Sequence, residues 1–170
     1  AEWLSAHPHP ESEEIIEVTE EELARASLLC APQQVLAVFR QPQETDNSTA
    51  PTRSLCLALD GVQDPGNLGT IIRLADWFGI EHIFCSQDTV DAYNPKVIQS
   101  TMGAIARVSV HYTSLSTLIK GLPTETPVYG TFLNGQNIYE QKLSEHGLII
   151  MGNEGKGIKA EIEELVRHKL

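Results

Sequence analysis

Cysteine is scarce in this sequence, and its pattern excludes a disulfide framework. Three cysteines occur in 170 residues, at Cys30, Cys56 and Cys85, and each has apolar neighbours. An odd number of widely spaced cysteines is typical of reduced core cysteines in a cytoplasmic protein. No apolar run is long enough to span a membrane and no signal-peptide pattern occurs, so the sequence predicts no membrane partner.

Clusters of metal ligands are equally rare. The one histidine cluster is His7-Pro8-His9, and its proline-rich surroundings are typical of an exposed loop rather than of a ligand pair. The sequence therefore predicts no metal site.

Basic side chains are also few. The chain has 12 Lys and Arg against 23 Asp and Glu, a net charge of −11, whereas affinity for nucleic-acid phosphate comes largely from lysine and arginine. The first 53 residues carry ten acidic and three basic side chains and so supply −7 of that charge. The remainder is only mildly acidic. An RNA site there requires a local basic patch or a contribution from another subunit or segment.

One stretch combines a strand, a tight turn and a helix. Residues 55–59 (LCLAL) form a continuous apolar run that predicts a strand covered on both faces. Asp64-Pro65-Gly66-Asn67 follows with four turn-favouring residues, and Asn67 is expected to cap a helix. Apolar side chains then recur at helical spacing over residues 68–78, and Gly79 stands where a C-terminal cap belongs.

This arrangement places polar side chains at the carboxyl end of a strand and at a helix N-terminus, where open α/β sheets bind ligands. Asn67, Gly69 and Arg73 lie off the apolar stripe of the helix. Gly69 is expected to allow a close backbone approach, and Arg73 offers a permanent charge with forked donors. The same spacing also fits an ordinary strand, turn and helix with one solvated arginine.

Strand and helix patterns alternate through the rest of the chain. The predicted strands are residues 80–85, 108–112, 128–133 and 148–151, and the predicted helices are residues 94–105, 114–120 and the segment from Ile158 onward. Such alternation predicts a mostly parallel α/β sheet with helices on both faces.

A glycine-rich loop, GNEGKG at residues 152–157, follows the last of these strands. Its three glycines allow backbone N–H groups to point inward as a nest for an anionic or polar ligand, although a flexible turn is the alternative. Glu154 is expected to meet a partner, either Arg73 or a ligand hydroxyl. Neither a Walker A loop nor a dinucleotide fingerprint occurs in the chain.

A third strand end lies at residues 130–135 (GTFLNG). In a doubly wound sheet Asn67, Thr131 and Gly152 would lie along one edge, where a cofactor can span them.

The front of the chain has a different character. Residues 15–18 and 35–39 predict short strands, and the capping box at Thr19 and Glu22 predicts a helix to about Leu29. We therefore expect residues 1–43 to be the end of a small α/β domain. Polar residues without periodicity follow, so 44–53 are expected to form a linker before the main domain at 54–170.

Together these motifs resemble the SpoU-type (TrmH) RNA 2'-O-ribose methyltransferases of the SPOUT superfamily. The first family motif is matched by DPGNLGTIIR at residues 64–73, and the second by IMGNEGKG at residues 150–157. The segments NPK at residues 94–96 and STMGA at residues 100–104 are also similar to the family. The resemblance covers residues 55–170.

The resemblance implies methyl transfer from S-adenosylmethionine to a ribose 2'-hydroxyl of RNA, with rRNA favoured over tRNA because the front segment is similar to the end of a ribosomal-protein-like recognition domain. It also implies a homodimer and a deep C-terminal trefoil knot at the cofactor site. By the same resemblance, Asn67, Arg73 and Glu154 are catalytic, while the cofactor-binding residues are Thr131, Leu133, Gly152, Asn153 and Gly157.

Arg73 is a poor candidate for the general base of such a reaction, because a guanidinium stays protonated in proteins. We expect it instead to bind an RNA phosphate and to stabilise the developing alkoxide.

A third family motif, a Ser-Leu-Asn-Val-type segment entering the final helix, is expected after the segment that begins at Ile158 but does not occur before Leu170. The knot and one wall of the cofactor pocket are therefore expected to be incomplete in these residues. Two alternatives stay open: a noncatalytic RNA-binding module with the same fold, and a nucleotide-phosphate enzyme, for which no Mg²⁺-binding carboxylate pattern occurs.

Overall fold

The computed structural model describes residues 14–29, 31–43 and 45–170. The chain divides into two units, Ala1–Pro42 and Gln43–Leu170, which are described separately. Two predicted features, Cys30 and the His7-Pro8-His9 loop, lie outside the described residues.

The first unit contains one described helix, α2 (Glu20–Ala26). The predicted capping box is confirmed, since the Glu22 amide donates to the Thr19 hydroxyl and the Thr19 amide donates to the Glu22 carboxylate. The two predicted strands at residues 15–18 and 35–39 are wrong, because neither segment pairs with another strand among the described residues. Their apolar side chains are exposed, and a strand without a neighbour leaves its backbone groups to water.

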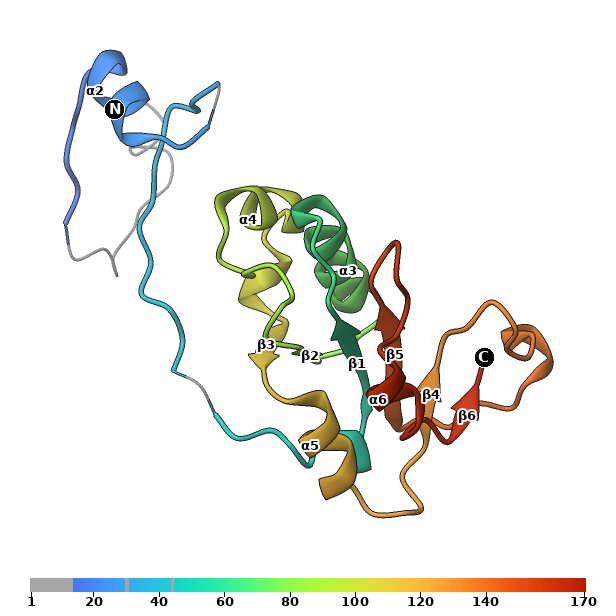
Figure 1. Ribbon diagram of the computed structural model, residues 1–170. Coiled ribbons are helices and arrows are strands. Elements are labelled where there is room, and N and C mark those ends of the chain that lie inside the picture. Colours follow the sequence, from blue (N-terminus) through green and yellow to red (C-terminus); the bar gives the residue numbers. More distant parts are fainter. Residues whose placement is uncertain (1–13, 30, 44) are drawn as a thin grey trace. The chain divides into compact units, whose positions relative to one another are not determined.

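The second unit is built on a six-stranded sheet in the order β3-β2-β1-β5-β4-β6, in which every pair is parallel. Strand β1 lies near the centre and pairs with β2 on one side and β5 on the other (Figure 1). The strands are β1 (Leu55–Asp60), β2 (His82–Cys85), β3 (Ser109–Tyr112), β4 (Val128–Gly130), β5 (Gly147–Gly152) and β6 (His168–Lys169).

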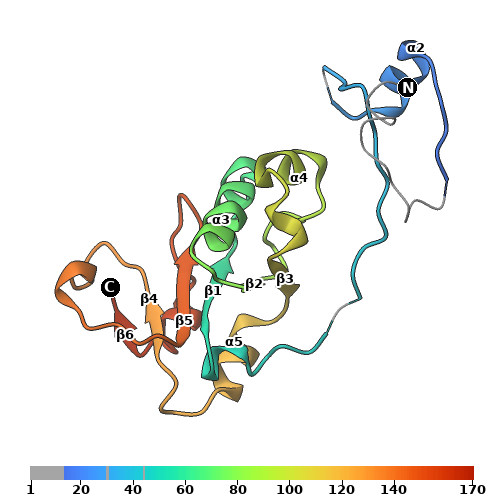
Figure 2. The same ribbon diagram turned by 180° about the vertical axis from the view of Figure 1, so that it is seen from behind.

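Helices cover both faces of this sheet, so the predicted α/β architecture is confirmed (Figures 1 and 2). On one face, α3 and α4 pack on side chains such as Leu59 and Ile83; on the other, α5 and α6 pack on Ala58 and Ile150. These two apolar layers arise because successive side chains of a strand point to opposite faces. The helices are α3 (Pro65–Trp77), α4 (Pro95–Thr101), α5 (Leu115–Gly121) and α6 (Ala160–Glu163), with single turns η1 (Ala50–Thr52), η2 (Ala104–Ala106) and η3 (Ile138–Glu140).

Cys56 and Cys85 are free and buried in these layers, as the sequence predicts for reduced core cysteines. Burial raises the pKa of the Cys85 thiol to about 12, so the thiol stays protonated and unreactive at neutral pH.

The predicted helix from residue 158 to the end is wrong beyond its first turn. Helix α6 ends at Glu163, and the chain then returns to the sheet as β6, which pairs with β4. Sheet hydrogen bonds from the Arg167 amide to the Val128 carbonyl and from the Leu170 amide to the Gly130 carbonyl outweigh the helical spacing. The apolar side chains in this segment still face the core, which is why they imitate a helical stripe.

Two other boundaries also differ from the prediction. The predicted helix over residues 94–105 divides into α4 and η2 because Met102 and Gly103 adopt left-handed backbone angles, with φ of 52° and 88°. The strand predicted to reach residue 133 ends as β4 at Gly130.

Candidate functional site

Three neighbouring strands end at one edge of the sheet. The last residue of β1, Asp60, pairs with Gly152 at the end of β5, and Gly130 at the end of β4 pairs with Ile150. The Thr131 amide and hydroxyl then both donate to the Ile150 carbonyl, at 3.1 and 3.2 Å. Thr131 and Gly152 therefore lie on this carboxyl edge, as the sequence predicts for a doubly wound sheet.

Helix α3 starts from the same edge, and its cap differs from the one predicted. Asp64, not Asn67, is the N-cap: its Oδ1 accepts from the Asn67 amide at 2.8 Å, and Pro65 occupies the first helical position. Pro suits that position because its missing N–H would have no partner within the helix. The Asn67 side chain is thus released for another contact.

We expect Asp64→Ala to lower the free energy of unfolding by about 1 kcal/mol, because a helix amide loses its acceptor. Urea denaturation provides the measurement. Asp64→Asn is the matched control and should retain most of the stability, since its side-chain oxygen still accepts the hydrogen bond. Equal losses in the two variants would contradict the assigned cap.

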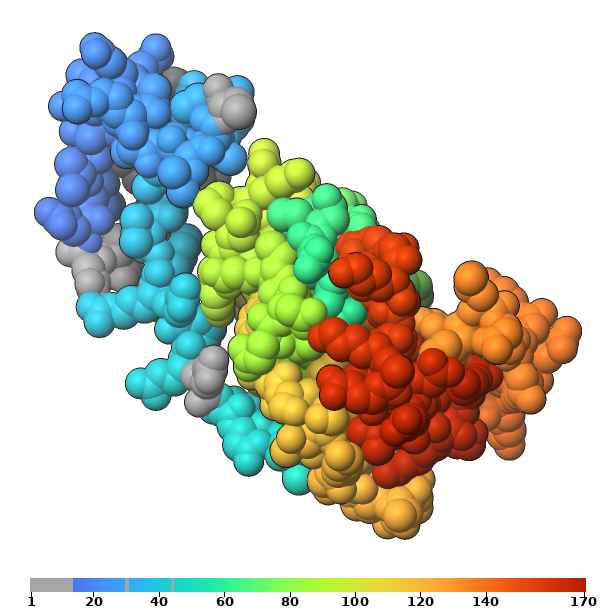
Figure 3. All heavy atoms as spheres, viewed as in Figure 1, coloured from blue at the N-terminus to red at the C-terminus, as the bar shows by residue number. Residues whose placement is uncertain are grey.

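Asn67 and Glu154, far apart in sequence, meet at this edge. The Asn67 Nδ2 donates to Glu154 Oε1 at 2.9 Å, and the Asp64 amide donates to the same oxygen at 3.4 Å. Figure 3 shows the loop after β5, in red, against the green atoms of α3. The sequence correctly predicts a partner for Glu154, but that partner is Asn67 rather than Arg73.

These hydrogen bonds lower the pKa of Glu154, with the Asn67 side chain as the largest cause. A carboxylate that accepts hydrogen bonds is favoured over its protonated form. Because the pKa is lower in the folded state, Glu154 adds stability above its ordinary pKa, and this contribution is lost as the pH falls through the folded pKa. Glu154 is therefore ionised at neutral pH.

Asn67→Ala is expected to raise the pKa of Glu154 toward its ordinary value, because the largest stabilising hydrogen bond is removed. An NMR titration of the Glu154 carboxyl carbon measures this shift. Asn134→Ala, at an exposed asparagine in another loop, is the control and should leave the pKa unchanged. An unshifted pKa in Asn67→Ala would show that the hydrogen bond is absent in solution.

Arg73 lies on the exposed surface of α3, within two helical turns of Asn67. Its side chain makes no hydrogen bond or ion pair with the described residues. The forked guanidinium is thus available to an external anion.

The GNEGKG loop is closed by its own hydrogen bonds. Asn153 and Gly157 form an antiparallel bridge, with N–O distances of 3.0 and 2.9 Å. The Asn153 Oδ1 accepts from the Gly155 and Lys156 amides, each at 3.0 Å. The predicted anion nest is wrong in this respect, because an internal side chain already uses those amides.

Two glycines of the motifs are explained by chain packing. A Cβ on Gly69 would lie 2.4 Å from Ser100 Cβ, so the close approach predicted at Gly69 is that of α4 rather than of a ligand. A Cβ on Gly152 would lie 2.1 Å from the Gly157 carbonyl carbon. Gly157 itself has φ of 72°, a left-handed angle that favours glycine.

Leu133 follows Thr131 in the loop after β4 and is fully exposed, with a relative exposure of 110 %. Leu133 is therefore an apolar side chain open to solvent near this edge of the sheet.

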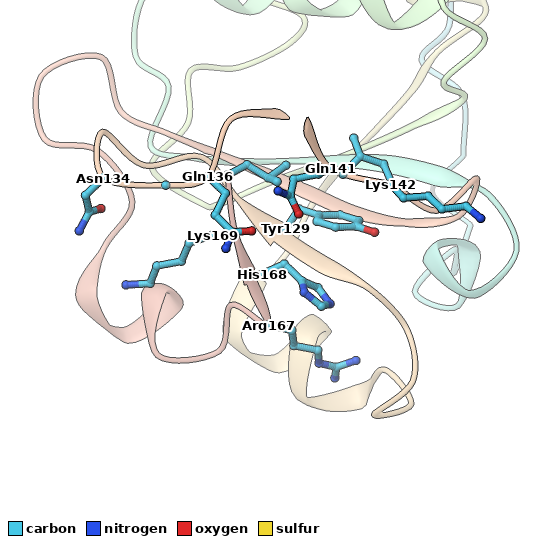
Figure 4. A pocket seen from close by; sticks show the side chains of 11 residues that line it. Tyr129, Asn134, Gln136, Gln141, Lys142, Arg167, His168 and Lys169 are labelled. Carbon is cyan, nitrogen blue, oxygen red and sulfur yellow. The ribbon is translucent and has the colours of Figure 1, made fainter. Parts of the chain in front are cut away.

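A depression of about 640 Å³ lies beside β4 and β6 and was not predicted from the sequence (Figure 4). Much of its basic lining is committed to other contacts, since Arg167 donates to four carbonyls, among them that of Thr126, and Lys169 pairs with Glu163. The only signal in the sequence was a pair of basic side chains after α6, Arg167 and Lys169. Basic side chains at this place also suit a helix C-terminus. The residues that line the depression are Tyr129, Asn134, Gly135, Gln136, Gln141, Lys142, Leu143, Arg167, His168, Lys169 and Leu170.

In the part of the chain that the structure describes, no three His, Cys, Asp or Glu side chains are grouped to hold a metal ion. None of the described helices has the length and apolar character needed to cross a membrane.

Residues 54–170 match the SpoU rRNA Methylase family. The chain belongs to this family. It is 40 % identical over 135 residues to the 23S rRNA (guanosine(2553)-2'-O)-methyltransferase RlmP of Bacillus subtilis, an alignment that covers 78 % of this chain and 53 % of that protein. The chain thus spans about half the length of this curated relative.

Solved structures of SpoU relatives share the fold. A structure from Porphyromonas gingivalis assigned to the TrmH family of RNA methyltransferases superposes with a TM-score of 0.88 at 38 % identity and covers 100 % of this chain and 69 % of its own. An AdoMet-bound rRNA methyltransferase from Sinorhizobium meliloti gives a TM-score of 0.61 at 30 % identity, covering 69 % of this chain and 46 % of its own.

Proposed function

We propose that this SpoU family member transfers a methyl group from S-adenosylmethionine to a ribose 2'-hydroxyl of RNA, with rRNA favoured over tRNA. The observation that carries the proposal is the Asn67–Glu154 contact of 2.9 Å, which joins the two family motifs at the carboxyl edge of the sheet. The RNA 2'-O-methyltransferase named among the relatives supports the same reaction.

The polar residues at this edge take separate roles in the proposed reaction. Bound S-adenosylmethionine would supply the methyl group from its sulfonium, so that a C–O bond would form at the ribose as the C–S bond breaks and leaves a neutral thioether. The ionised Glu154, held by Asn67, orients the target nucleotide by accepting a hydrogen bond from it. Arg73 binds the adjacent phosphate and stabilises the developing alkoxide, while the hydroxyl proton passes to a phosphate oxygen and then to water.

The edge formed by β4 and β5 fits the cofactor. Adenosine and methionine groups require apolar contacts and backbone polar groups, and Leu133 supplies a fully exposed apolar side chain two residues after Thr131. We assign Thr131, Leu133, Gly152, Asn153 and Gly157 to the walls of this site. Gly152 and Gly157 allow the two ends of the GNEGKG loop to pass close to each other, and Asn153 fixes the turn of that loop.

Three further properties belong to the proposal: a trefoil knot, a homodimer and a cytoplasmic location. The loop between β4 and β5 supports the knot, because it surrounds the end of β6 in Figures 1 and 2. Within it, the Phe132 amide donates to the Leu170 carbonyl at 2.8 Å and the Gln136 amide to the Lys169 carbonyl at 3.1 Å. We further propose that residues 1–43 are part of an RNA-recognition domain and that 44–53 are its linker.

A second candidate is a noncatalytic RNA-binding module with this fold. Such a module holds either RNA or another partner without catalysis, and the net charge of −11, which opposes tight binding to RNA phosphate, favours the second of these. The nucleotide-phosphate enzyme loses its support, since the GNEGKG amides are bonded to Asn153.

Calorimetric titration of the whole protein separates these functions. The proposal predicts binding heat with S-adenosylmethionine and with S-adenosylhomocysteine, which share the adenosine and amino-acid groups. ATP should give none, because its triphosphate has no anion nest to occupy. Binding of ATP alone, or of no ligand, would contradict the proposal, and the second outcome favours the noncatalytic module.

A further inference from the structure

The buried carboxylate of Asp60, at the end of β1, binds the backbone of Lys159, just after the GNEGKG loop. Asp60 is 1 % exposed, and its Oδ2 accepts from the Lys159 amide at 2.7 Å. Its Oδ1 lies 3.2 Å from Lys159 Nζ, an ion-pair distance at which no hydrogen bond is aligned. A buried charge is tolerated only with such compensation, so Asp60 and Lys159 are strongly coupled.

Gly61, the residue after β1, holds the other end of the same loop. The Gly61 carbonyl accepts from Asn153 Nδ2 at 2.7 Å, and Asn153 bridges to Gly157. Asp60 and Gly61 thus fix the loop on both sides of Glu154. The position of the Glu154 carboxylate relative to Asn67 depends on these two anchors.

We propose that Asp60 is a positioning residue, which acts through Lys159 to place Glu154 against Asn67. The inference rests on the proposed catalytic role of Glu154. Asp60 contacts neither Asn67 nor Glu154 itself, and its contribution is the fixed path of the loop. A turn anchored at one end only would let the carboxylate move, and displacement of about 1 Å in a catalytic group lowers rates by about 100-fold.

A second carboxylate, Asp88, provides a matched comparison. It accepts from Lys159 Nζ at 2.9 Å and from the Ser86 hydroxyl at 2.7 Å, but its side chain is 48 % exposed. Asp88 contacts the ammonium group only, whereas Asp60 also holds the Lys159 backbone. The proposal therefore assigns the positioning role to Asp60 and not to Asp88.

Amide hydrogen exchange tests the anchor without an activity assay. Asp60→Asn keeps the shape of the side chain but offers one acceptor oxygen where Lys159 presents two donors. We expect exchange at Gly155 and Gly157 to accelerate about 10-fold or more in Asp60→Asn and less than about 3-fold in Asp88→Asn, with the Leu118 amide of α5 unchanged. Equal rates at the two loop glycines in wild type and Asp60→Asn would overturn the proposal.

Lys159→Met keeps the test decisive if Asp60→Asn does not fold, because it leaves the backbone contact of Lys159 in place. We expect the exchange rates at Gly155 and Gly157 to stay closer to wild type in Lys159→Met than in Lys159→Pro. Proline has no amide N–H to donate to the Asp60 carboxylate. Equal effects of the two Lys159 variants would overturn the backbone anchor.

A double-mutant cycle then shows whether Asp60 acts through Glu154. We expect Asp60→Asn to lower kcat about 10-fold with little change in KM, and to have no more than about a 2-fold effect in a Glu154→Gln background. A full 10-fold loss in that background would overturn the positioning role. If wild type transfers no methyl group, the proposed function fails, and hydrogen exchange alone decides the role of Asp60.

Discussion

Arg73→Lys is expected to lower the rate of methyl transfer by about 100-fold or more, the magnitude seen when a donor to a developing oxyanion is lost. Lysine retains the charge but cannot reproduce the planar fork that binds a phosphate through two hydrogen bonds. The side chain is exposed and makes no polar contact with the described residues, so the free energy of unfolding should change by less than about 0.5 kcal/mol. Single-turnover transfer assays give the rate.

Arg53→Lys is the matched control, since Arg53 is also exposed and lies at the end of η1, away from the site. It should transfer methyl groups at the wild-type rate. Full activity in Arg73→Lys would remove Arg73 from the proposed mechanism.

Gly152→Ala is expected to destabilise the domain by about 1–3 kcal/mol, the range for side chains forced into occupied space. The added Cβ would lie 2.1 Å from the Gly157 carbonyl carbon and 2.3 Å from the Ile158 amide nitrogen. Both are backbone atoms, so the clash is relieved only by moving the loop that carries Glu154. Activity should therefore fall together with the unfolding free energy measured in urea.

Gly121→Ala, at the end of α5, provides the comparison. A Cβ there would meet nothing within 4 Å, and the residue has no left-handed φ. We expect this variant to be unchanged or up to about 1 kcal/mol more stable, because alanine restricts the unfolded chain. A Gly152→Ala variant as stable as Gly121→Ala would show that the backbone at Gly157 and Ile158 leaves room for a side chain at residue 152.

The sheet was predictable from the sequence because local and tertiary preferences agree there. The apolar runs that become β1 and β5 are covered on both faces, and the alternation with helices leaves few topologies other than a parallel sheet. Where the two preferences disagree, the prediction fails. In β6 the hydrogen bonds to β4 decide the structure, and no periodicity within residues 158–170 reveals them.

The candidate site was predictable in its residues but only partly in its contacts. Spacing indicates that Asn67, Thr131 and Gly152 meet at one edge, because carboxyl ends of parallel strands must do so. Asp64 rather than Asn67 caps α3, because the Asp64 carboxylate accepts the hydrogen bond from a first-turn amide. Both residue types suit an N-cap, so the sequence does not decide between them. The contact between Asp60 and Lys159 could not be predicted for another reason. The two residues are far apart in the sequence, and they meet only because α6 packs on the sheet.

The position of the transferred methyl group tests the proposed reaction directly. The whole protein is incubated with unmodified rRNA transcript and S-adenosylmethionine labelled in its methyl group, and the digested nucleosides are analysed by mass spectrometry. We expect label on the ribose oxygen of one nucleotide, with the flanking phosphodiester resistant to alkali because the 2'-hydroxyl is blocked. We expect much less label with Glu154→Gln. Label on a base, or equal labelling by wild type and Glu154→Gln, would contradict the proposed reaction.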